Sequence, residues 1–198
     1  SNALVVNPAV PVNTIQELIQ YSKANPGKLS SGASLGIGPH VTLELLRART
    51  GSSMAFIPYR GAAPAISDLL GNQIQIGMTT KAVLLPLIKD GKLRALAVTS
   101  DARWPELPDV PTMRESGFTG VPAYLWIGLL APAQTPAAVI EKLNGAMNEG
   151  LKAPEVQASM AKLGLEARSV TSQQFAAALA DETRLWEAAV KESGVQLD

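Results

Sequence analysis

The stretch Leu29–His40, with the sequence LSSGASLGIGPH, contains the pattern that decides the fold of this chain. A short strand pattern runs into a glycine-rich turn, and Pro39 then opens a helical pattern. The stretch Phe56–Gly61, FIPYRG, repeats this arrangement, and Pro64 follows its last glycine. Proline is favoured in the first turn of a helix, where its missing N–H costs nothing. Both stretches therefore predict a strand that leads through a tight turn into a helix.

Each predicted turn places a helix N-terminus at the end of a strand. The first N–H groups of a helix have no partner within the helix, and the helix dipole adds partial positive charge there. Two such ends at one edge of an α/β sheet are typical of a site for a carboxylate. The residues that we expect to bind it are Ser34, Gly36, Ile37, Gly38 and His40 in the first turn, Tyr59, Gly61 and Ala62 in the second, and Thr79 and Thr80 at the end of a later strand.

Two interpretations of these turns stay open. The glycines allow a positive φ and close approach of a ligand to the backbone, and the Ser34 hydroxyl can donate to a carboxylate. The same residues also suit a tight turn that binds nothing. His40 can hydrogen-bond a ligand, or it can cap the helix and pack against its neighbours, and we slightly favour the structural role.

The composition excludes several classes of protein. With 46% hydrophobic and 17% charged residues, the 198-residue chain is globular. Lys and Arg together number 17, as do Asp and Glu, so no basic surface indicates nucleic acid as a partner. The chain has no Cys and a single His, which leaves no thiolate or histidine-rich metal site, and no cofactor is predicted. No apolar run approaches the roughly 20 residues of a membrane span.

A catalytic pattern is also present in the first turn. Gly32–Gly36, GASLG, matches the G-x-S-x-G sequence of the nucleophile elbow in α/β-hydrolases. The only histidine, His40, follows Ser34 by six residues, whereas the base of that fold lies far downstream. The glycines and the proline after Ser34 also delay a helix that an elbow enters directly. We therefore predict that the chain is not an enzyme and keep hydrolysis at Ser34 as a less favoured alternative.

Hydrophobic periodicity predicts alternating strands and helices in the first half of the chain. Leu4–Val6 begins as a strand, and the capping box Thr14–Glu17, TIQE, opens a helix that ends near Ala24. Such alternation indicates a mainly parallel sheet with helices on both faces. The other expected helices cover 39–50, 64–70 and 84–90, and the other expected strands cover 30–34, 54–59, 73–78 and 93–98.

The last third of the chain is mainly helical in pattern. A strand is expected over Tyr124–Leu130, and helices are expected from Thr135, from Pro154 to Leu163, and after the capping box Thr171–Gln174. In the first of these helices Val139, Leu143 and Met147 share one face.

Eight short segments, in their order and spacing, carry a resemblance to a known family. They are Leu4–Pro8, Asn25–Leu29, Gly38–His40, Pro58–Gly61, Asp68–Gly71, Gly91–Thr99, Leu107–Thr112 and Ala131–Pro132. Together they resemble the solute-binding proteins of tripartite tricarboxylate transporters, the Bug or TctC-like family. The resemblance implies a two-lobed periplasmic receptor that closes on a small carboxylate and delivers it to the membrane subunits of the transporter. Many members have an acidic residue at the position of Thr79, so its loss favours a plain carboxylic acid over an amino acid.

The resemblance also implies a domain organisation. We expect an α/β fold similar to a type II periplasmic-binding-protein lobe with a mainly parallel sheet, plus a C-terminal helical segment of the other lobe. Residues 1–3 resemble the remnant of a cleaved tag, 4–100 form the second ligand-binding lobe, 101–123 are a crossover, and 124–198 complete the first lobe. The chain is then a fragment without a signal peptide or the N-terminal part of the first lobe.

Two further expectations follow from the fragment interpretation. Apolar residues over 125–130 and in the helix after Thr135 would lack their usual partners, so a homodimer of the fragment is expected. The runner-up among binding proteins is the effector-sensing domain of a transcription regulator, which shares the two-lobed architecture. That alternative requires a DNA-binding helix-turn-helix, which this sequence does not contain.

Overall fold

The computed structural model describes residues 1–120, 126–162 and 165–195. The chain forms two compact units, which are described separately. The first comprises Ser1–Leu125 with Leu185–Asp198, and the second comprises Trp126–Arg184. Within the described residues, no helix is long and apolar enough to cross a membrane.

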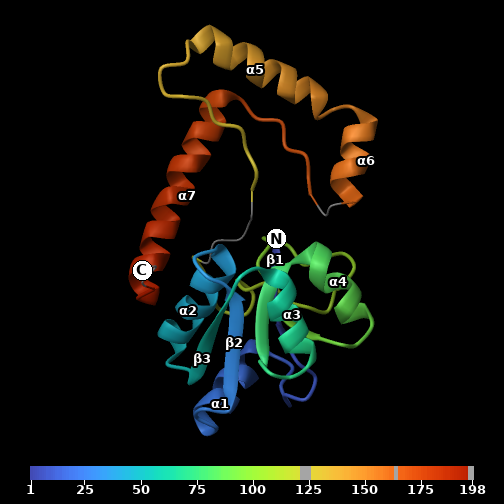
Figure 1. Ribbon diagram of the computed structural model, residues 1–198, viewed down its shortest axis with the longest axis vertical. Coiled ribbons are helices and arrows are strands. Elements are labelled where there is room, and N and C mark those ends of the chain that lie inside the picture. Colours follow the sequence, from blue (N-terminus) through green and yellow to red (C-terminus); the bar gives the residue numbers. More distant parts are fainter. Residues whose placement is uncertain (121–125, 163–164, 196–198) are drawn as a thin grey trace. The chain divides into compact units, whose positions relative to one another are not determined.

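The first unit is built on one five-stranded sheet with the order β3-β2-β4-β1-β5 (Figure 1). β2 pairs in parallel with β3 and β4, whereas β1 is antiparallel to both β4 and β5. Four strands therefore share a direction and β1 opposes them, which confirms a mainly parallel sheet. The strands are β1 Asn2–Val6, β2 Leu29–Ser34, β3 Met54–Tyr59, β4 Ile76–Thr80 and β5 Arg94–Val98.

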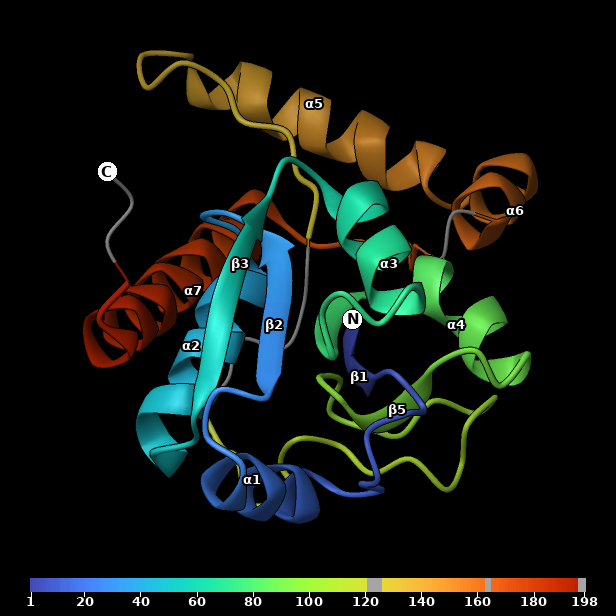
Figure 2. The same cartoon turned by 60° about the horizontal axis from the view of Figure 1, so that its bottom comes forward.

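Helices cover both faces of this sheet, as its alternating apolar pattern requires. One core cluster joins Leu4 and Val6 of β1 to α1 and α2, and a second joins Ala3 and Val5 to α3 and α4. In both views α3 and α4 lie together, apart from α1 and α2 (Figures 1 and 2). These helices are α1 Ile15–Ala24, α2 Gly38–Thr50, α3 Ala62–Leu70 and α4 Lys81–Lys89.

Capping side chains set where two of the predicted helices begin. Thr14 Oγ1 accepts the Glu17 N–H at 3.1 Å, and the Glu17 carboxylate accepts the N–H of Asn13 at 2.7 Å. The helix α7 Ser172–Ser193 begins in the same way. Thr171 Oγ1 accepts the Gln174 N–H at 3.1 Å, and Gln174 Oε1 accepts the Thr171 N–H at 2.9 Å. Both capping boxes are confirmed, although Glu17 reaches one residue further back than the pattern implied.

The described part of the segment after β5 packs within the first unit. Thr112 lies parallel to Val98, and the Met113 N–H donates to the Val98 carbonyl at 2.8 Å, which covers the edge of the sheet. The side chains of Trp104 and Met113 are buried. In its described part, this segment therefore contributes apolar side chains to the core of the first unit.

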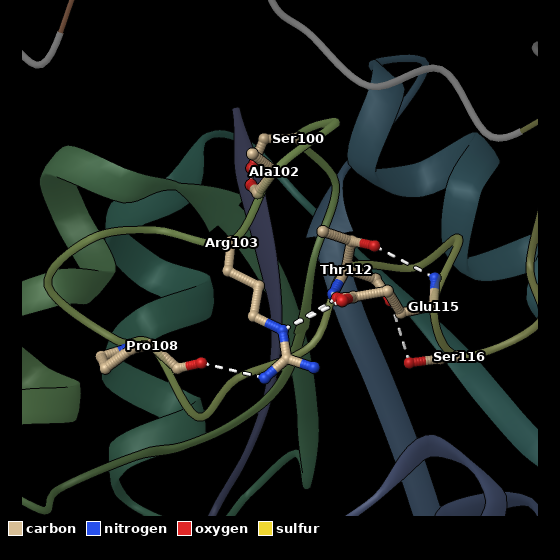
Figure 3. Close-up of polar contacts among 7 residues, drawn as sticks. All are labelled: Ser100, Ala102, Arg103, Pro108, Thr112, Glu115 and Ser116. Atoms are coloured by element: carbon tan, nitrogen blue, oxygen red, sulfur yellow. Dashed lines mark hydrogen bonds and ion pairs between the residues drawn. The ribbon is translucent and has the colours of Figure 1, made fainter.

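Arg103 and Glu115 clamp this segment (Figure 3). The Arg103 guanidinium lies 3.0 Å from Glu115 Oε2 and donates to the Pro108 carbonyl at 2.9 Å. Glu115 also accepts the Thr112 N–H at 2.7 Å, and Thr112 Oγ1 accepts the Glu115 N–H at 3.0 Å. The chain between residues 103 and 115 is thus held as a closed loop.

Three further expectations need correction. Asn2 and Ala3, expected outside the fold, lie in β1, where Asn2 N–H donates to Thr99 Oγ1 at 2.9 Å. β4 begins at Ile76 and extends to Thr80, because Asn72 adopts a positive φ and turns the chain before the strand. α4 consequently begins at Lys81, ahead of the expected residue 84.

The second unit contains helices and loops in its described part. α5 Ala137–Gly150, α6 Pro154–Lys162 and the first turns of α7 Ser172–Ser193 form it. Residues 126–130 are not in a strand, contrary to expectation, and residues 124–125 lie outside the described residues. Ile127, Leu129 and Leu130 are 77, 77 and 73% exposed, and no residue of α5 is buried.

We expect this exposed apolar run to make the chain self-associate, because contiguous apolar patches are rare on soluble monomers. Replacing Ile127, Leu129 and Leu130 together with serine should shift the chain to monomer in sedimentation velocity at about 100 μM, where even weak dimers form. Val83→Ser, at an isolated exposed position, is the control and should change nothing. A sharp monomer boundary for the unaltered chain would refute the expectation.

Replacing Glu115 with Gln should lower the urea midpoint of unfolding at neutral pH by a small amount. Hydrogen bonds from Arg103 and the Thr112 backbone hold the pKa of Glu115 below its usual value. A carboxyl with a lowered folded-state pKa stabilises the fold above its unfolded pKa and loses that contribution as pH falls through the folded value. The difference between the two proteins should therefore vanish in acid.

The control for this experiment is Asp90→Asn, which weakens only an exposed 3.6 Å pair with Lys92 and should leave the midpoint unchanged. A Glu115→Gln difference that stays constant from neutral pH into acid would contradict the clamp.

Candidate ligand-binding site

A pocket in the first unit lies at the carboxyl ends of β2 and β4, beside the first turns of α2 and α3. Ligands of open α/β sheets bind at this edge. Ser34 and Thr79 contribute hydroxyls, and both side chains are half-buried. In the described part of the chain, no charged residue lines the pocket. Its lining residues are Gly32, Ala33, Ser34, Ile37, Ala62, Ala65, Ile66, Leu69, Gly77, Met78 and Thr79.

Two glycines of the lining allow neighbouring side chains to reach the sheet. A Cβ on Gly32 would lie 2.7 Å from Tyr59 Cε2, and one on Gly77 would lie 2.8 Å from Leu69 Cδ2. Real Cβ atoms are essentially never found so close to other carbon atoms, so a larger residue at either position would force the neighbouring side chains to move. Gly32, the first glycine of the G-x-S-x-G pattern, therefore has a packing function.

The structure brings together four of the ten predicted site residues. Ser34, Ile37, Ala62 and Thr79 line the pocket, whereas Gly36, Gly38, His40, Tyr59, Gly61 and Thr80 do not. The sequence analysis missed the apolar lining residues on β4 and α3, Ala65, Ile66, Leu69 and Met78. Two features of the sequence could have indicated them. Met78 directly precedes Thr79, and the other three lie in the helix that follows Gly61.

Gly36 was expected to offer its N–H to a carboxylate, and the structure uses that group internally. The Gly36 N–H donates to His40 Nδ1 at 3.2 Å, and the residue has a φ of +74°, which favours glycine. Gly38 has a different role, because a Cβ there would lie 2.9 Å from Trp186 Cη2 of α7. The absence of a side chain at Gly38 lets α7 pack against α2.

His40 is buried and has a structural role. Its ring stacks on Phe56 with centroids 4.1 Å apart, and burial lowers its pKa more than the nearby Glu44 carboxylate raises it. Among the described residues, no hydrogen bond joins His40 to Ser34, and its Nδ1 is occupied by the Gly36 N–H. His40 is therefore not placed to activate Ser34 as a nucleophile, and the hydrolase alternative fails on geometry.

Tyr59 is engaged within the fold. Its hydroxyl donates to Asp68 Oδ2 at 2.8 Å, across the turn from β3 into α3. Burial first, and then the hydrogen bond and charge of Asp68, raise the pKa of Tyr59 to about 12. This hydroxyl, expected to contact a ligand, thus links β3 to α3. The next residue, Arg60, is exposed.

Comparison with known proteins identifies the family to which the chain is similar. Residues 1–195 match the tripartite tricarboxylate transporter family receptor. Protein BugT of Bordetella pertussis is 35% identical over 195 residues, which are 98% of this chain and 60% of BugT. The chain therefore spans about three fifths of the length of this relative.

Solved structures show the same similarity. The periplasmic binding protein BugD is 34% identical with a TM-score of 0.82, and the match covers 98% of this chain and 66% of BugD. Rpa4515 of R. palustris, solved with adipate, is 30% identical with a TM-score of 0.82 over 98% of this chain and 65% of its own.

Tyr59→Phe should lower the free energy of unfolding by about 1 kcal/mol, the usual net contribution of one intramolecular hydrogen bond. The phenyl ring would still fill the space above Gly32, so only the bond to Asp68 is lost. Chemical denaturation measures the change. Tyr21→Phe is the matched control, because no hydrogen bond from the Tyr21 hydroxyl exists among the described residues. Equal stability of both variants would contradict the role of the Tyr59–Asp68 bond.

Proposed function

This chain belongs to the tripartite tricarboxylate transporter receptor family, and from that premise we propose that it binds a small carboxylate for such a transporter. One observation in the structure supports the proposal above the others. Two hydroxyls and two helix N-termini converge on an uncharged pocket at the carboxyl edge of the sheet. Each of these groups is a donor suited to a carboxylate oxygen.

The donors act together because a carboxylate accepts several hydrogen bonds. Ser34 and Thr79 donate from their hydroxyls, and the first turns of α2 and α3 present backbone N–H groups near Ile37 and Ala62. The dipoles of both helices add partial positive charge at these ends. Hydrogen bonds to a charged group are stronger than those between neutral groups, so this set can hold a carboxylate without Arg or Lys.

The remaining lining indicates the chemistry of the rest of the ligand. Ala65, Ile66, Leu69 and Met78 are apolar and suit a methylene chain. Among the described residues, no Asp or Glu lines the pocket, so a ligand amine would find no carboxylate partner from them. The substrate class that we propose is an unsubstituted mono- or dicarboxylic acid, in preference to an amino acid. Adipate, present in the structure of Rpa4515, belongs to this class.

The partners and location of the chain follow from the same premise. We propose that the first unit is one ligand-binding lobe and that the second unit belongs to the other lobe of a receptor. In this arrangement the receptor encloses the carboxylate in the periplasm and passes it to the membrane subunits of the transporter. Closure of two lobes around a ligand is a common hinge motion of periplasmic binding proteins. The chain alone should then bind more weakly than a complete receptor.

Titration with adipate, followed by NMR chemical shifts, tests the site because it detects weak binding. Ser34→Ala and Thr79→Val should each weaken binding by about ten- to a hundredfold, the effect of losing one hydrogen bond to a charged group. Thr80→Val is the matched control, because Thr80 follows Thr79 directly but does not line the pocket. Its affinity should equal that of the unaltered chain.

The titration has a clear negative outcome. If the Ser34→Ala and Thr79→Val variants bind adipate as tightly as the unaltered chain, the carboxylate binds elsewhere. Tighter binding of 2-aminoadipate than of adipate would contradict the proposed preference against a ligand amine.

A further inference from the structure

Helices α1 and α2 begin with the same unusual hydrogen bond. In α1 the third helical residue, Glu17, accepts the N–H of Asn13, which precedes the N-cap residue. In α2 the third helical residue, His40, accepts the N–H of Gly36, which also precedes the N-cap residue. The N-cap of α2, Ile37, makes no side-chain capping bond. His40 therefore fixes the start of α2 in the way that Glu17 fixes the start of α1.

The surroundings of His40 keep this bond in place. The side chain is 4% exposed, and stacking on Phe56 of β3 restrains the ring. The His40 N–H also donates to the Ile37 carbonyl at 2.9 Å, which closes the first turn of the helix. Burial lowers the pKa of His40, so the imidazole is neutral at neutral pH. Because Nδ1 accepts the Gly36 N–H, the ring proton of the neutral imidazole is on Nε2.

A neutral hydrogen-bond acceptor is important at the start of α2 because the pocket lies beside it. Ile37 lines the pocket, and so does Ser34, two residues before Gly36. A carboxylate at the position of His40, like that of Glu17 in α1, would repel an anion bound at the end of α2. Imidazole makes the same hydrogen bond without a negative charge.

We propose that His40 is a positioning residue of the carboxylate site. By accepting the Gly36 N–H, it fixes the turn Leu35–Gly38 and holds Ile37 at the pocket without placing a negative charge there. It does not touch the ligand. This inference rests on the proposed function, and it assigns the Gly36 N–H to the protein both with and without ligand.

The first measurement detects the bond directly. An N–H···N hydrogen bond transmits a scalar coupling between its two nitrogen nuclei, so the Gly36 amide nitrogen and His40 Nδ1 should show one in labelled protein. The coupling should persist when adipate saturates the site. Absence of the coupling, or its loss on adding adipate, would overturn the inference, because Gly36 would then be free to bind the ligand.

The second measurement compares variants by adipate titration. His40→Leu removes the acceptor and should weaken binding by about tenfold, the equivalent of one lost hydrogen bond. His40→Asn places Oδ1 where Nδ1 lies and should restore affinity to within about threefold of the unaltered chain. Leu45→Val, a buried change in the same helix that leaves the Gly36 bond intact, controls for lost stability and should bind adipate normally.

The outcomes separate the two proposals. If His40→Leu and Leu45→Val lose affinity for adipate in proportion to the stability that each loses, His40 acts only as a packing residue. That result would overturn the inference. Unchanged affinity of His40→Leu would also overturn it. If the unaltered chain shows the coupling but no response to adipate, the proposed function fails, and the positioning role fails with it. If His40→Leu does not fold, the His40→Asn titration and the persistence of the coupling under adipate decide.

Discussion

Two glycines in neighbouring strands leave room on one face of the sheet, Gly77 for Leu69 of α3 and Gly32 for Tyr59 and Ile74, and both line the pocket. Gly32 of β2 and Gly77 of β4 are register partners, and neither position has room for a Cβ. Side chains two residues apart on a strand point to the same face. Ser34 and Thr79, each two residues further on, therefore share the face that α3 covers. The constraint that admits α3 also brings both hydroxyls to its N-terminal end.

Local signals in the sequence predicted most helices and strands of the first unit, and long-range pairing explains what they missed. The capping boxes at Thr14 and Thr171 and the strand over 54–59 needed only neighbouring residues, and they were correct. The direction of β1 depends on pairing with β4 and β5, far along the chain. The strand expected at residues 126–130 failed because the described part of the second unit contains no strand for it to pair with.

The residues of the candidate site can also be divided into those that the local sequence predicts and those whose contacts it does not predict. Ser34 and Thr79 were predictable because hydroxyl residues at strand ends face the ligand edge of a parallel sheet. The partners of Gly36 and Tyr59 lie four and nine residues along the chain and depend on how each turn folds, whereas the partner of Gly38 is a distant ring. Trp186 approaches Gly38 from α7, almost 150 residues further along the chain, and no local pattern indicates that contact.

The distribution of charge gives a physical reason for a site built from neutral donors. Among the cations of the first unit, Arg47 is paired with Glu44, Arg49 with Glu192 and Lys81 with Glu106. A cation buried in the pocket would lose its partner whenever the ligand left, and an unpaired buried charge is costly. Hydroxyls and helix N-termini can exchange the carboxylate for water at a smaller cost. Under the proposed function the receptor must release what it binds, and an uncharged pocket reduces the penalty for release.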